Sequence, residues 1–216
     1  MNGDRTGAAR AGSRWTSRLA FLSIVIWLAA AESAGRLGIW LAIGGASVVL
    51  GVVILVTDRS ASAALLRANA RRILVGVAAG ALMGAATYLL YPPVARLWPF
   101  ITTDTARLYA AFRAPSVAVA SVALVPIIVG EELVWRGVVQ TWLTRRLGAW
   151  GGVALAAFAY AMVHAPLGSP VLVAVAFACG LAWGTLRAAT ASLVPSLVAH
   201  VLWDVVVLLW LPLDGR

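Results

Sequence analysis

Several long apolar segments alternate in this sequence with short links that carry arginine. A helix needs about 20 apolar residues to cross the hydrocarbon core of a bilayer. The chain is 62% hydrophobic, whereas an ordinary soluble domain is about 45–50% apolar. We therefore expect an all-α fold, a polytopic transmembrane helical bundle.

About seven spans are predicted from the apolar segments. Residues 1–18 are expected to form a disordered, basic cytoplasmic arm, residues 19–112 the N-terminal transmembrane helices, and residues 113–212 a membrane core. Pro92-Pro93 is expected to stop the third span, and residues 92–114 to hold a short interfacial helix on the outer side. A cleaved signal peptide remains an alternative for the first segment. The predicted spans are 19–31, 37–56, 73–91, 116–143, 151–163, 170–186 and 193–211.

Glycines spaced four residues apart indicate where predicted helices approach closely. They are Gly76, Gly80 and Gly84 on the third span, and Gly180 and Gly184 on the sixth. The one cysteine, Cys179, excludes an internal disulfide and a cysteine-rich metal site.

The basic residues, all arginine, give the chain a net charge of +9 and indicate its orientation in the membrane. Alternating spans from an inside N-terminus put eleven arginines on the inner side and five on the outer side, as the positive-inside rule requires. We expect a multi-pass protein of the plasma membrane, with membrane lipid as a partner. The arginines form no dense stripe with aromatic residues, so nucleic acid is not an expected partner. The absence of lysine resembles proteins of GC-rich bacteria, which suggests a bacterial inner membrane.

Charged and titratable side chains interrupt three of the predicted spans, although an ionised group at bilayer depth costs about 2.5–3.5 kcal/mol or more. The fourth span holds two adjacent carboxylates and an arginine, the fifth ends in a histidine, and the last contains a histidine and an aspartate. These residues are Glu131, Glu132, Arg136, His164, His200 and Asp204.

Residues four apart share a helix face, so Glu132 is expected to pair with Arg136, and His200 to lie beside Asp204. The Glu132–Arg136 pair is most simply structural. Glu131 has no partner in its own helix, and a packing role for each polar group remains open.

An unpaired glutamate and two histidines on three spans can also form a water-activating site. Glu131 could act as general base, while histidine and Asp204 stabilise negative charge on a carbonyl oxygen. Equally, Glu131, His164 and His200 could hold zinc and leave a position open to water, with Glu132 or Asp204 assisting. The residues alone leave both options open: a Zn²⁺ cofactor or none.

Three motifs occur in order: Glu131-Glu132-x-x-x-Arg136, Tyr160-x-x-x-His164 and His200-x-x-x-Asp204. Together they resemble the CPBP family, which contains the type II CAAX prenyl endopeptidases and the bacterial Abi membrane proteases. The resemblance covers residues 113–212 and implies a catalytic cavity inside the bundle. It implies that Glu131 and His164 activate water, and that His200 and Asp204 act on the oxyanion or on a metal. The family is called metalloprotease, and a metal-free glutamate mechanism is also argued for it.

Two residues depart from the pattern of the resembled family. Tyr160 stands where phenylalanine is usual, and Asp204 where the CAAX enzymes commonly have asparagine. An ionised aspartate cannot donate a hydrogen bond to an oxyanion. Asp204 is therefore protonated, orients His200, or acts with a metal.

The resulting prediction is an intramembrane endopeptidase that cleaves a membrane-associated protein or peptide, either a CAAX protease-like metalloendopeptidase or a glutamate protease. Bacteria generally lack protein prenylation, so peptide maturation, self-immunity or regulated proteolysis are the expected roles. The alternatives are a non-catalytic membrane scaffold or immunity protein, and a transporter that uses the buried charges as a relay. Motifs of site-2-type, presenilin-like and rhomboid-type proteases are absent.

Overall fold

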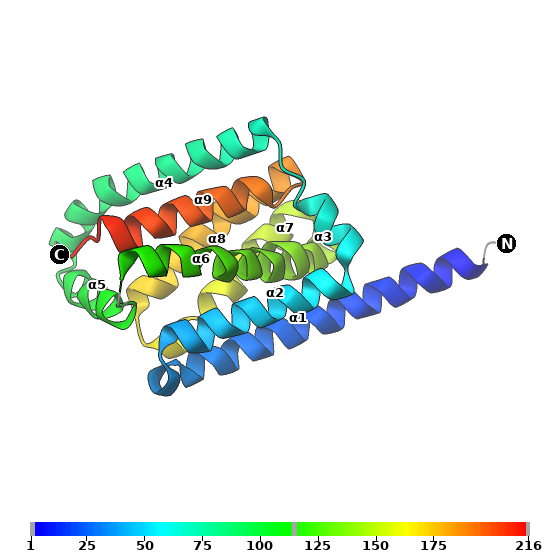
Figure 1. Cartoon of the computed structure of the whole chain (residues 1–216), viewed down its shortest axis with the longest axis horizontal. Helices are drawn as coiled ribbons and strands as arrows, with labels where there is room; N and C mark the ends of the chain where they lie inside the picture. Colours follow the sequence, from blue (N-terminus) through cyan, green and yellow to red (C-terminus); the bar gives the residue numbers. More distant parts are fainter. Residues whose placement is uncertain (1–2, 114–115, 215–216) are drawn as a thin grey trace.

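The computed structural model describes residues 3–113 and 116–214, with side chains from Thr16 onward. The described residues form helices and no strand, and the long helices lie side by side in one bundle (Figure 1). The α-helices are α1 (Gly3–Leu37), α2 (Gly45–Thr57), α3 (Arg59–Leu65), α4 (Ala70–Leu97), α5 (Phe100–Ala111), α6 (Val117–Glu132), α7 (Gln140–Met162), α8 (Pro170–Thr190) and α9 (Val194–Asp204). Three π-helical segments and one 3₁₀ turn join or extend them: η1 (Trp40–Gly44), η2 (Leu133–Val139), η3 (Ala165–Leu167) and η4 (Val205–Trp210).

The predicted all-α membrane bundle is confirmed. Five helical stretches of the described residues are long and apolar enough to cross a membrane: Thr16–Leu37, Trp40–Thr57, Ala70–Leu97, Val117–Leu167 and Pro170–Thr190. Large apolar side chains such as Phe21, Leu82 and Val122 are more than two-thirds exposed, as expected of lipid-facing positions. The number of spans, predicted as seven, stays a prediction.

The stretch Val117–Leu167 is folded back on itself rather than straight. Gly148 has φ 74° and ψ 174°, a backbone conformation that favours glycine and that breaks the helix inside α7. The Tyr160 hydroxyl donates to Glu131, 29 residues earlier, although a straight helix would separate them by about 43 Å at 1.5 Å per residue. The predicted fourth and fifth spans therefore form an antiparallel helical hairpin.

Two predictions about helix ends are wrong. The basic arm is not disordered, because α1 begins at Gly3 and continues into the first span; this segment is rich in alanine and arginine, which favour helix. The third span does not stop at Pro92-Pro93, because α4 continues to Leu97 with both prolines inside. Transmembrane helices tolerate proline where neighbouring groups satisfy the freed backbone.

Glycine contacts join the helices as predicted. A Cβ at Gly76 or Gly80 would press against Val198 or Ala199 of α9, and one at Gly180 against Ala157 of α7. Gly84 is buried, but no neighbour lies within 4 Å of a Cβ placed there. These close approaches hold α9, which carries His200, and α7, which ends two residues before His164, against their neighbours.

The connector after α4 contains the predicted short helix, α5. Asp104 fixes it to the start of α8, since its Oδ2 accepts from the Ser169 hydroxyl at 2.6 Å and the Val171 amide at 3.0 Å. The Tyr109 hydroxyl donates to the Val207 carbonyl at 2.6 Å. Helix α5 therefore lies across one end of the bundle, where the C-terminus also lies (Figure 1).

Candidate active site

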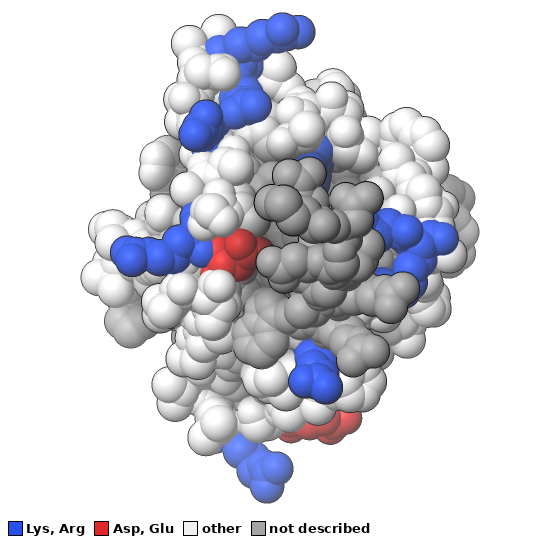
Figure 2. All heavy atoms as spheres, turned by 90° about the vertical axis from the view of Figure 1, so that its right-hand side faces the viewer, with Lys and Arg blue, Asp and Glu red and all other residues white. Residues whose placement is uncertain are grey.

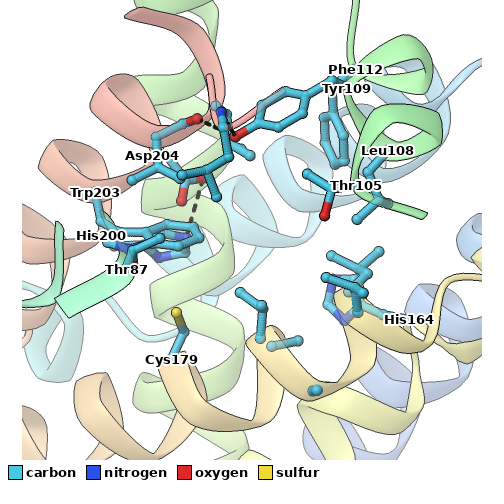
Figure 3. Close-up of a pocket in the computed structure, with 18 of the residues that line it drawn as sticks. Thr87, Thr105, Leu108, Tyr109, Phe112, His164, Cys179, His200, Trp203 and Asp204 are labelled. Atoms are coloured by element: carbon cyan, nitrogen blue, oxygen red, sulfur yellow. Dashed lines mark hydrogen bonds and ion pairs between the residues drawn. The ribbon is translucent and has the colours of Figure 1, made fainter. Parts of the chain in front are cut away.

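A cavity of about 390 Å³ opens between η1, α4, α5, α6, α8, α9 and the end of α7. Side chains of all three sequence motifs line it: Glu131, Tyr160, His164, His200 and Asp204. Figure 3 shows His164 and His200 on opposite sides of this space. The convergence expected from the sequence is therefore present. Glu132 and Arg136 lie behind the wall rather than on it.

Tyr160 contacts both groups expected to activate water. Its hydroxyl donates to Glu131 Oε2 at 3.0 Å, and its backbone carbonyl lies 2.6 Å from His164 Nδ1. A carbonyl only accepts, so His164 Nδ1 carries a proton and, in the neutral ring, Nε2 is an acceptor. Glu131 is 8% exposed and His164 is 7% exposed. Each side chain reaches the cavity and is otherwise buried. Tyr160 thus positions two proton acceptors at one wall.

The predicted ion pair between Glu132 and Arg136 is present, with Oε1 and Nη1 3.2 Å apart. The Arg136 guanidinium carbon lies 4.6 Å from the Tyr160 ring centre and 5.0 Å from that of Trp183. Such contacts stabilise a desolvated cation by roughly 0.5–2 kcal/mol. Arg136 is therefore a structural counter-ion held between two aromatic rings.

His200 contacts a carboxylate on each side. Its Nδ1 lies 3.0 Å from Glu132 Oε1, the same oxygen that Arg136 contacts. Its Nε2 lies 3.6 Å from Asp204 Oδ2, beyond ordinary hydrogen-bond length. The ring stacks on Trp183, with centres 3.6 Å apart and planes 19° from parallel. This arrangement orients Nε2 toward the cavity wall that Asp204 shares.

Backbone features place Glu131 and Glu132 at the middle of the bundle. Helix α6 changes directly after Glu132 into the π-helical segment η2, a form that is frequent at functional sites. One residue before Glu131, a Cβ at Gly130 would collide with the Ser47 carbonyl, and one at Gly51 would touch the Gly130 backbone. Helices α2 and α6 therefore cross in backbone contact next to Glu131.

The zinc ligand set considered from the sequence does not fit the observed contacts. Among the residues that the structure describes, no group of three or more His, Cys, Asp and Glu side chains could hold a metal ion. Glu131, His164 and His200 share the cavity without sharing one coordination point.

Several site contacts were not foreseen from the sequence. Trp183 supports His200 and Arg136, and Trp27 of α1 lies 5.4 Å from the His164 ring, centre to centre. Tryptophans in apolar segments look like ordinary core residues, so no pattern marks them. Gly130 directly precedes the two carboxylates, and a glycine in an apolar helix can indicate a close helix contact, so the sequence did contain a signal for this crossing.

Comparison with known proteins gives one finding. Residues 113–206 match a family model described as Type II CAAX prenyl endopeptidase Rce1-like. No curated protein and no solved structure matches the chain. The matched segment contains all three motifs and every motif residue at the cavity.

Proposed function

We propose, on the premise that residues 113–206 form an Rce1-like domain of a membrane protease family, that the protein is an intramembrane endopeptidase. Its substrate is the peptide bond of a membrane-associated protein or peptide, and its partners are that substrate and membrane lipid, without nucleic acid. The plasma membrane is its proposed location. One observation carries the proposal: Glu131 of α6, His164 directly after α7, and His200 and Asp204 of α9 line one cavity.

In this proposal a water molecule lies between Glu131 and His164. Glu131 Oε2 accepts from Tyr160, which leaves Oε1 free to accept a proton from the water. His164 Nε2 can accept a second hydrogen bond from the same water, since Nδ1 is engaged by the Tyr160 carbonyl. Removal of a proton by Glu131 makes the water a nucleophile toward the peptide carbonyl.

His200 is proposed to stabilise the oxygen of the attacked carbonyl. Glu132 and Asp204 flank the ring, so both ring nitrogens can carry protons, and Nε2–H can donate to the developing oxyanion. Asp204, at 3.6 Å, then orients His200 and replaces the asparagine of the resembled enzymes without donating itself. The proton held by Glu131 passes to the leaving amine, which completes hydrolysis.

No step of this scheme uses a metal ion. Among the described residues, no group of three or more His, Cys, Asp and Glu side chains is placed to hold a metal ion, which supports that choice over the zinc option.

The substitution Glu131→Gln tests the proposed function. Purified protein in lipid nanodiscs is incubated with a pool of internally quenched apolar peptides, and products are identified by mass spectrometry. Wild type cleaves some of the pool, and Glu131→Gln is slower by about 10²–10⁴-fold, the usual contribution of a general base.

Glu32→Gln is the matched control, because it makes the same chemical change at an exposed position of α1. It retains the wild-type rate. Circular dichroism and thermal unfolding verify that both variants are folded. A folded Glu131→Gln variant with the wild-type rate, or a wild type that cleaves nothing while Glu131→Gln still binds its partner, would point to the scaffold alternative.

A further inference from the structure

The two ends of the helical bundle differ in charge. One end contains α3, the start of α4, the kink of α7 and the end of α8. Backbone and side-chain bonds tie these parts together: Leu193 N and Ser192 Oγ donate to the Leu65 carbonyl, and Trp142 Nε1 and Arg146 Nη2 to Ser17. The arginines here are Arg18, Arg59, Arg67, Arg71, Arg72, Arg145, Arg146 and Arg187.

Figure 2 views this arginine-rich end directly. Blue basic groups lie at several separate places around it, and red acidic groups are visible at two. The opposite end, which contains α5 and the end of α4, has Arg36, Arg96, Arg107 and Arg113 among the described residues. The arginine-rich end is therefore the one that the positive-inside rule assigns to the cytoplasm.

The cavity lies at the other end. Its walls include Val94 near the end of α4, Thr105 and Leu108 of α5, and Val171 at the start of α8. Leu213, near the C-terminus, also lines it. Val94 and Val171 lie near a helix end and a helix start on the arginine-poor side, and α5 lies across that end. Glu131, where α6 continues into η2, and His200, within α9, form the deeper part of the cavity.

The wall of the cavity is apolar apart from the motif residues, tyrosine and threonine hydroxyls and Cys179. No arginine or lysine lines it in the part of the chain that the structure describes. Glu131 and Asp204 do line it, and the protonated His200 ring already lies between Glu132 and Asp204. A carboxylate brought inside would therefore face like charge and find no unpaired cation among the described residues. A buried charge without a partner is unfavourable. An uncharged apolar segment is the substrate that this wall suits.

We propose that the cavity opens toward the extracytoplasmic face of the membrane and takes an uncharged, apolar peptide segment presented there. The cut falls at an internal bond, because the one cationic ring that the described residues place in the wall, His200, is already flanked by Glu132 and Asp204 and leaves no unpaired cation for a free C-terminal carboxylate. The cleavage step in this inference rests on the proposed function. The side from which the cavity is reached is argued only from the charge at the two ends of the bundle and from the position of the cavity.

Site-specific labelling tests the side of access without any need for activity. In a Cys179→Ala background, Thr103→Cys places an exposed thiol on α5, and Ser60→Cys places one on α3. A membrane-impermeant maleimide is added to right-side-out and to inverted vesicles from a bacterial host. Thr103→Cys is expected to react in right-side-out vesicles, and Ser60→Cys in inverted ones. The reverse pattern, or reaction of both thiols from both sides, overturns the proposal.

Peptide cleavage in the same vesicles tests the substrate class. Quenched peptides with an uncharged apolar centre are compared with peptides that have one aspartate or a free carboxylate there. Right-side-out vesicles are expected to cleave the apolar set at least tenfold faster; equal rates, or cleavage by inverted vesicles alone, contradict the proposal. If labelling succeeds while wild type and Glu131→Gln are equally inactive, the proposed function fails and the orientation stands.

Discussion

At the scale of residues, the site depends on side chains that each satisfy two neighbours. Tyr160 contacts Glu131 through its hydroxyl and His164 through its carbonyl. Glu132 Oε1 contacts both Arg136 and His200. Spacing alone predicted the Glu132–Arg136 pair, because both partners belong to one helical turn. The contacts of Glu132 with His200 and of Tyr160 with Glu131 join distant segments, so no local pattern could predict them.

The Tyr160 hydroxyl gives the first prediction. Tyr160→Phe keeps the ring beside Arg136 and the carbonyl beside His164, but it removes the hydrogen bond to Glu131. A hydrogen bond to a charged group contributes about 1.5–3 kcal/mol, so kcat should fall by roughly 10–100-fold. Steady-state kinetics should show little change in KM. An unchanged kcat would mean that this hydroxyl does not orient Glu131.

Metal dependence gives the second prediction at this scale. Because no group of three or more His, Cys, Asp and Glu side chains among the described residues is placed to hold a metal ion, cleavage should continue at the wild-type rate after dialysis against a strong chelator. Elemental analysis of the purified protein should find less than one equivalent of zinc. Loss of activity that added zinc restores would instead favour Glu131, His164 and His200 as ligands.

At the scale of helices, glycine contacts and aromatic packing set where the proposed catalytic groups lie. Most helices begin and end near the predicted residues, because apolar length is a strong signal. Two helix ends were predicted wrongly, one at the basic arm and one at Pro92-Pro93. In the arm the charged residues suggested a loop, and at Pro92-Pro93 the prolines did. There the helix continues into a packed span, and this tertiary context outweighs the local signal.

The crossing of α2 and α6 gives the third prediction. Gly130→Ala forces the two backbones apart at Ser47, and such overpacking typically costs about 1–3 kcal/mol. The variant should unfold at lower temperature and lose activity, since the shift moves Glu131. Gly35→Ala is the control, because a Cβ there meets no atom within 4 Å. Equal stability of the two variants would contradict the backbone contact.

Helix α1 gives the fourth prediction, because it contacts the site although it lies outside the matched segment. Trp27 is fully buried and packs on His164, Trp135 and Tyr160. Trp27→Ala should cost about 3–5 kcal/mol of stability, whereas Trp27→Phe should keep the fold and a measurable rate. Thermal unfolding and kinetics check both, with Trp98→Ala, at an exposed tryptophan, as the control. Wild-type stability of Trp27→Ala would show that α1 does not support the site.

At the scale of the whole molecule, a membrane-embedded bundle encloses a polar site near its middle and opens it at one end. The apolar exterior follows from composition and was predicted. The shape of the cavity was not, because it depends on how α5 and the C-terminal residues fold over the helix ends, through Asp104 and Tyr109. Sequence motifs identified the residues that meet there, and packing determines how they meet.

The central claim is that Glu131 and His164 on one side, and His200 on the other, act on one peptide bond inside this cavity. Its most direct test is an experimental structure of the Glu131→Gln variant in a lipid nanodisc with a bound, uncleaved apolar peptide. We predict a carbonyl carbon beside residue 131 and His164, with its oxygen within hydrogen-bond distance of His200 Nε2. A peptide bound outside the cavity, or a carbonyl oxygen directed away from His200, would contradict the account.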